Sequence, residues 1–131
     1  MLGPAIRAGL TYGAEAFALG FALALLRIPL LVPAIGEFAA VLCEIPVMLA
    51  AMLLRARAII RRSSIDTARQ RTAMGLTGFA LLMVCEWGLA LVLGQGSQGW
   101  LASLATLPGA IGLAGQLIFA MLPLMVRNPG G

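Results

Sequence analysis

Ionisable side chains interrupt the apolar runs of this chain at a few positions: Glu15, Arg27, Glu37, Glu44 and Glu86. An ionisable group is costly in apolar surroundings, so it usually forms an ion pair or carries a proton or cation. These residue types therefore fit two kinds of chemistry. One is a buried ion pair that holds helices together, and the other is a site that binds and releases a proton or a cation.

The composition indicates that these groups lie in a membrane. Of the 131 residues, 61% are hydrophobic and 11% are charged, whereas soluble globular domains carry roughly 25% charged residues. The chain has no histidine, which removes the usual proton shuttle and the commonest axial ligand of haem. We expect an all-α, polytopic membrane protein that has no cofactor and is not an enzyme.

Apolar segments predict a bundle of four transmembrane helices in a single domain, residues 1–131. The expected helices cover residues 8–31, 35–54, 73–94 and 107–126. The first of these is about 36 Å long at about 1.5 Å per residue, which is enough to cross the hydrocarbon core of a bilayer. A tight turn at residues 32–36 would join the first two helices as an antiparallel hairpin. Residues 100–106 are expected to lie at the membrane interface, anchored by Trp100.

Six of the nine basic residues lie in a predicted cytoplasmic loop, residues 55–72. They are Arg55, Arg57, Arg61, Arg62, Arg69 and Arg71. Cytoplasmic loops are enriched in arginine, so both termini are expected inside, in a bacterial inner membrane. We expect these arginines to contact anionic lipids rather than nucleic acid. Ser64 or Asp66 would cap a short interfacial turn that leads into the helix at residues 73–94.

Counting residues from the expected outer ends of the helices places four of the charged groups in the outer half of the membrane. Glu44 would lie about 13 Å deep, Glu86 about 12 Å and Arg27 about 6 to 8 Å, with Glu37 near the surface. Arg27 is expected to pair with Glu37 or Glu44. Because one arginine cannot balance three carboxylates, we expect a proton on Glu86 or Glu44.

Of two functions that fit this evidence, we expect the first, which acts through helix contacts inside the membrane. Glu–Arg pairs would fix helix packing in an accessory or assembly subunit, or in a homo-oligomer. Alternatively, Glu15, Glu44 and Glu86 would couple a small transporter or channel to protons or cations. A dry Arg–Glu clamp would favour the first function, and a water-lined cavity the second. Gln116 is expected to serve helix packing.

The chain also repeats a Cys-Glu pair, at Cys43-Glu44 and Cys85-Glu86. Two such pairs facing each other would suit a soft metal ion. Adjacent residues on a helix, however, point about 100° apart. We therefore predict inert cysteines and no metal site.

Overall fold

A computed structural model describes residues 2–126, and this part of the chain is helical almost throughout. The elements in chain order are α1 (Gly3–Leu26), a π-helical turn (Arg27–Leu31), α2 (Val32–Ile35), α3 (Glu37–Ser63), α4 (Ala68–Val92), α5 (Gly96–Leu104) and α6 (Leu107–Met125). The all-helical architecture expected from the sequence is confirmed.

Four helices of the described chain are long and apolar enough to cross a membrane: Gly3–Ile35, Glu37–Ser63, Ala68–Val92 and Leu107–Met125. Many large apolar side chains on these helices are exposed, including Leu25, Leu54 and Val92. A soluble protein would hide such a surface, whereas lipid favours it.

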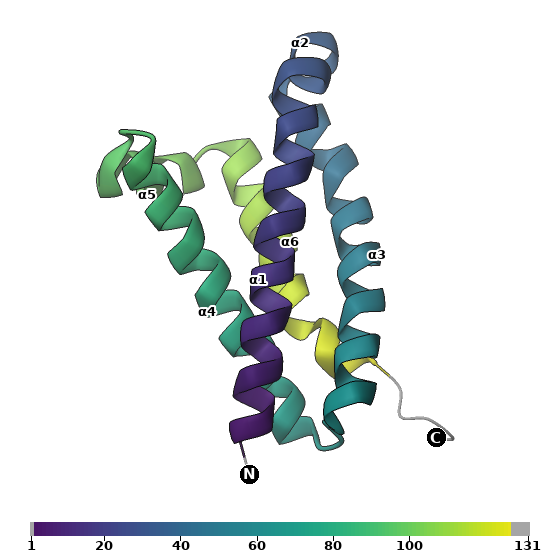
Figure 1. The fold of residues 1–131 in the computed structure, drawn as a ribbon. Helices are drawn as coiled ribbons and strands as arrows, with labels where there is room; N and C mark the ends of the chain where they lie inside the picture. The colour runs from purple at the N-terminus through teal and green to yellow at the C-terminus, as the bar shows by residue number, and fades with distance from the viewer. Residues whose placement is uncertain (1, 127–131) are drawn as a thin grey trace.

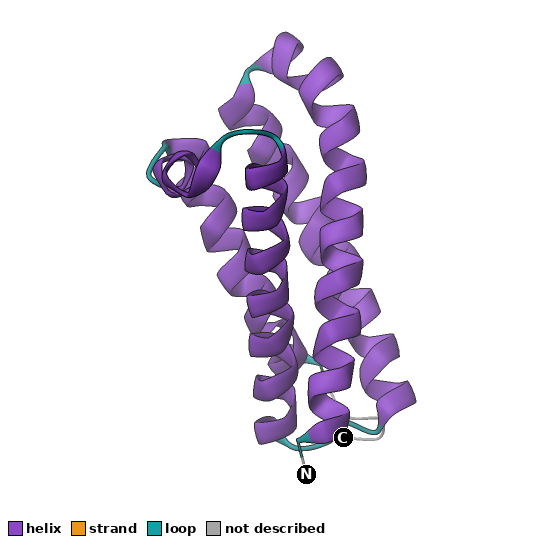
Figure 2. Cartoon of the chain, turned by 60° about the vertical axis from the view of Figure 1, so that its left-hand side comes forward, coloured by secondary structure: helices purple, strands orange, loops and turns teal. Residues whose placement is uncertain are grey.

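The long helices pack side by side, with α1 against α3 and α4, and α6 against α3 and α4. The start of α1, the end of α6 and the α3–α4 turn lie together at one end of the bundle, here called the arginine end (Figure 1). The opposite end carries α2 and α5 and is here called the α5 end. Figure 2 shows α5 lying across the long helices rather than along them.

Glycines bring the backbones of α1 and α4 into close contact in the half of the bundle near the arginine end. A Cβ atom on Gly13 would lie 2.6 Å from the carbonyl oxygen of Gly78, and one on Gly75 would lie 1.9 Å from that of Ala120 in α6. No side chain larger than hydrogen fits at these positions. Farther along α4, a Cβ atom on Gly88 would meet nothing within 4 Å, and the two helices diverge towards the α5 end (Figure 1).

The prediction of a basic loop at residues 55–72 is wrong. α3 continues to Ser63 and α4 begins at Ala68, so only four residues connect them. Ala56, Ile59 and Ile60 are buried at helical spacing, which extends the apolar face of α3 beyond the predicted end at residue 54. Arginine and alanine are also strong helix formers, so an arginine-rich segment that packs on the core stays helical.

The cap of α4 also differs from the prediction. Ser64 ends α3 in the left-handed conformation, with a φ of 55°. Thr67, rather than Ser64 or Asp66, caps α4: its hydroxyl accepts from the Gln70 backbone, and the Gln70 side chain accepts from the Thr67 backbone. This reciprocal capping box gives α4 a defined start.

The first helix is longer than predicted, and the turn predicted at residues 32–36 is confined to its last residue, Gly36. Helical structure begins at Gly3 and continues past Pro29 and Pro33 to Ile35. Proline lacks the N–H that an α-helix needs, and the widened π turn at Arg27–Leu31 lets the chain pass both prolines without breaking. The reversal occurs at Gly36, whose φ of 88° suits glycine. Of the interfacial segment predicted at residues 100–106, residues 100–104 belong to α5 and Thr106 caps α6.

A buried hydrogen bond ties α1 to α6. Because Pro123 has no N–H, the carbonyl of Phe119 lacks its usual partner within α6. The Tyr12 hydroxyl donates to that carbonyl oxygen at 2.6 Å, and the two aromatic rings stack with centroids 4.2 Å apart. An unpaired carbonyl would be expensive in this apolar interior. Tyr12 thus replaces the bond that Pro123 removes.

Replacing Tyr12 by phenylalanine should destabilise the fold by about 1 to 2 kcal/mol, because the Phe119 carbonyl loses its donor. Pro123→Ala restores a backbone N–H four residues after Phe119, so the same Tyr12→Phe change should cost less in that background. Denaturation of all four proteins in mixed micelles, followed by circular dichroism, measures the coupling. Equal costs in the two backgrounds would show that Tyr12 does not replace the helical bond.

Candidate functional site

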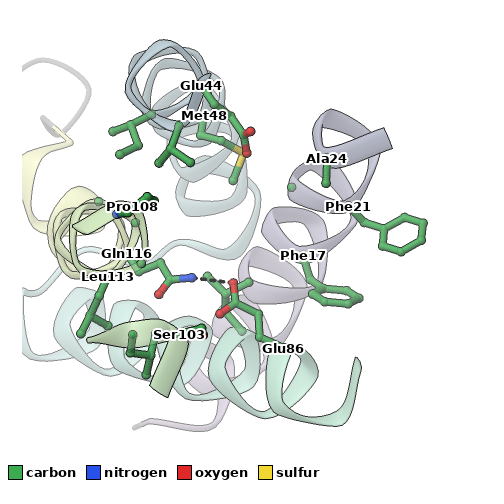
Figure 3. A pocket seen from close by; sticks show the side chains of 18 of the residues that line it. Phe17, Phe21, Ala24, Glu44, Met48, Glu86, Ser103, Pro108, Leu113 and Gln116 are labelled. Carbon is green, nitrogen blue, oxygen red and sulfur yellow. Dashed lines mark hydrogen bonds between the residues drawn. The ribbon is translucent and has the colours of Figure 1, made fainter. Parts of the chain in front are cut away.

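A cavity of about 420 Å³ lies between the diverging parts of the helices. Its walls come from α1, α3, α4, α5 and α6, and it extends from the middle of the bundle to the α5 end (Figure 3). Small-molecule sites in proteins typically measure about 300 to 1,000 Å³. The lining is mainly apolar, but it includes Arg27, Glu37, Glu44 and Glu86. The four groups predicted to share one half of the bundle therefore line a single cavity.

Arg27 and Glu44 form an ion pair on one side of this cavity. The guanidinium Nε lies 2.5 Å from Oε2 of Glu44, and the two side chains are only 20% and 17% exposed. Arg27 stands at the start of the π turn after α1, and Glu44 stands on α3. The prediction that Arg27 pairs with Glu37 or Glu44 is confirmed, and Glu44 is the partner. Glu37 is exposed in the first turn of α3, near the cavity mouth.

Glu86 faces the cavity from α4, and its contact is an amide rather than a cation. The Gln116 Nε2 on α6 donates to Glu86 Oε1 at 2.5 Å (Figure 3). Within residues 2–126, neither of the two ion pairs involves Glu86. The Gln116 Oε1 is buried and has no hydrogen-bond partner. Gln116, expected from the sequence to serve only helix packing, therefore belongs to the site.

Glu15 lies apart from the other candidate coupling residues. It accepts two hydrogen bonds from Arg55, one from Nε at 2.7 Å and one from Nη2 at 2.9 Å. This forked contact joins α1 to α3 and lies outside the lining of the cavity. Of the three glutamates proposed for proton or cation coupling, the structure brings Glu44 and Glu86 together and leaves Glu15 elsewhere.

The arginines of the predicted lipid-binding segment divide into two groups. Arg57, Arg61, Arg62 and Arg69 are exposed near the arginine end. Arg71 is buried and donates to the backbone carbonyls of Ile65 and Val126, and Arg55 is held by Glu15. These last two arginines join helices, whereas the exposed four remain accessible to lipid headgroups.

The cavity is closed towards the arginine end and bordered by α5 at the other. Its inner end is formed by Met52, Leu82 and Phe119, all of them buried in the core. At the α5 end it is bordered by Trp100 and Ser103. These packing residues carry no chemical signature in the sequence, so motif reasoning could not have identified them as cavity walls.

The two cysteines are free thiols. Cys43 is exposed on α3 and Cys85 is half-buried on α4. Within the described part of the chain, no three residues among histidine, cysteine, aspartate and glutamate come close enough together to hold a metal ion.

Comparison with protein-family models, with curated proteins and with solved structures gave no match. Any functional assignment therefore depends on the cavity and its charges.

Removing Arg27 should show how much stability the fold loses when Glu44 has no cation. Arg27→Met leaves Glu44 partly buried without a cation, and we expect a loss of about 3 kcal/mol of stability. The double variant Arg27→Met/Glu44→Met should recover part of this loss. Arg55→Met, at the more exposed pair, serves as the matched control and should cost less. Denaturation in micelles measures all three, and a double variant as unstable as Arg27→Met would contradict the pairing.

Proposed function

We propose that the chain crosses a bacterial inner membrane four times, with both termini in the cytoplasm. The four apolar helices support the number of crossings. The exposed arginines gather at the end where α1 begins and α6 stops, whereas the connections at the α5 end carry no basic side chain. Basic residues are typically enriched on the cytoplasmic side of a membrane protein and scarce on the external side. The arginine end is therefore assigned to the cytoplasm. Under this topology the cavity faces the external side.

Within this membrane we propose that the protein is a small proton- or cation-coupled transporter. The observation that carries the proposal is Glu86, a carboxylate on a cavity wall that contacts an amide instead of a cation. One arginine faces three carboxylates in the lining, so full ionisation leaves an excess of two negative charges. A proton or a bound cation would neutralise Glu86, and each would displace the other.

Such competition for one carboxylate is sufficient for coupled exchange and involves no covalent step. Passage to the cytoplasm would require the packed inner end, at Met52 and Phe119, to open. Four helices enclose too little space for a wide pathway, so we propose a homo-oligomer as the transporting form. We propose that Arg57, Arg61, Arg62 and Arg69 hold the cytoplasmic end against anionic lipid headgroups.

A second candidate is an accessory or assembly subunit that acts through helix contacts. The Glu15–Arg55 pair favours it, because it joins α1 to α3 outside the lining of the cavity, and the Tyr12–Phe119 bond also joins two helices. In this role Glu86 and Gln116 would be a further interhelical contact, and the exposed apolar faces would bind a membrane-protein partner.

The two candidates differ in the effect of Glu86→Gln. In liposomes that contain a pH-sensitive dye and monovalent cations and carry an imposed proton gradient, the wild-type protein should exchange protons for a cation. Glu86→Gln should abolish the flux, because an amide cannot exchange a proton, and Glu44→Gln should reduce it. Glu15→Gln, outside the cavity, is the control and should retain it.

Absence of flux in the wild type would contradict the transporter. If Glu86→Gln then lowered thermal stability or released a co-purifying protein, the glutamate would be a structural contact in an assembly subunit.

A further inference from the structure

We propose that the solute bound in the cavity is an amphipathic organic ammonium ion, that is, a protonated amine attached to an apolar body. This inference rests on the proposed transport function and names its substrate class. It follows from three properties of the cavity: where its uncompensated charge lies, which hydrogen-bonding atoms are free, and how large its apolar part is.

Of the two carboxylates that Arg27 does not balance, Glu37 is exposed and Glu86 is half-buried, so the uncompensated charge inside the cavity lies on the wall that carries Glu86. Arg27 and Glu44 already neutralise each other on the α1–α3 side. Glu86, on the α4 side, contacts only the amide of Gln116 among the described residues. A cationic solute therefore gains most beside Glu86, whereas an anion would meet an unpaired carboxylate there and be repelled.

The free hydrogen-bonding atoms beside Glu86 are acceptors. An ionised carboxylate accepts but cannot donate, and the buried Oε1 of Gln116 has no partner. Turning the Gln116 amide by half a turn would place Oε1 where Nε2 now contacts Glu86. The two side chains would then present acceptors to one ammonium group, which has N–H donors and a positive charge.

The size and lining of the cavity indicate an organic body. A water molecule occupies about 30 Å³, so a cavity of about 420 Å³ is far larger than an inorganic cation needs. Phe17, Met48 and Leu113 line it beside the polar groups (Figure 3). An apolar body would cover these walls.

Equilibrium dialysis of the purified full-length protein in detergent tests this assignment without requiring transport. The probes are radiolabelled 2-phenylethylammonium, neutral 2-phenylethanol and anionic phenylacetate, which share an aromatic body and differ in charge. Detergent without protein corrects for partitioning into micelles. We expect the ammonium ion to bind at least about tenfold more tightly than the alcohol, a difference of about 1.4 kcal/mol, and phenylacetate to bind most weakly.

Two variants locate the binding site. Glu86→Gln should remove the preference for the ammonium ion, whereas Glu15→Gln should keep it. Gly112→Leu tests the site independently if Glu86→Gln does not fold, because a side chain at Gly112 enters open space in the cavity wall. It should weaken binding of both the ammonium ion and the alcohol.

Equal binding of the three probes to the wild type, or an unchanged preference in Glu86→Gln, would overturn the inference. So would unchanged binding in Gly112→Leu. Proton flux without ammonium binding would overturn the substrate class but leave the proposed transporter intact. Ammonium binding without flux would support the site and count against transport.

Discussion

The close crossing of α1 and α4 determines the shape of the whole bundle. Because Gly13 meets the backbone of Gly78, and Gly75 meets that of Ala120, the helices near the arginine end approach to backbone contact. Straight helices that meet closely at one level and cross at an angle must separate elsewhere. They separate towards the α5 end, where α5 bridges the wider side and the cavity remains. Tyr12 completes the closed half by pairing with the carbonyl that Pro123 leaves free.

The charged groups are distributed according to this division of the bundle. In the closed half, Glu15 is matched by Arg55 and the buried Arg71 is matched by backbone carbonyls, so these groups join helices. In the open half, Arg27 is matched by Glu44, but Glu86 is left with an amide. A carboxylate in that position gains from any proton or cation that enters. The proposed function and the proposed substrate class both follow from this single mismatch of charge.

The sequence predicts the four apolar helices well because their signal, the length of each apolar run, is local. Counting also placed Arg27 and Glu44 in the same half of the bundle. It failed for residues 55–72, where buried Ala56 and Ile59 extend α3 and can be recognised only from the packing. The contact between Gln116 and Glu86 and the pairing of Glu15 with Arg55 were also missed, because they depend on helix rotation. The cavity itself results from a crossing between distant segments and has no local pattern.

The most direct test of a solvent-accessible cavity closed at Met52 and Phe119 is thiol labelling from each side of the membrane. A Gly112→Cys variant, with Cys43 and Cys85 replaced by serine, would be treated with an impermeant maleimide in right-side-out and in inverted vesicles. Ser97→Cys, exposed near α5, is the positive control. We predict labelling of Cys at position 112 in right-side-out vesicles only. Labelling only in inverted vesicles, or labelling in neither while the control reacts, would contradict an externally open cavity.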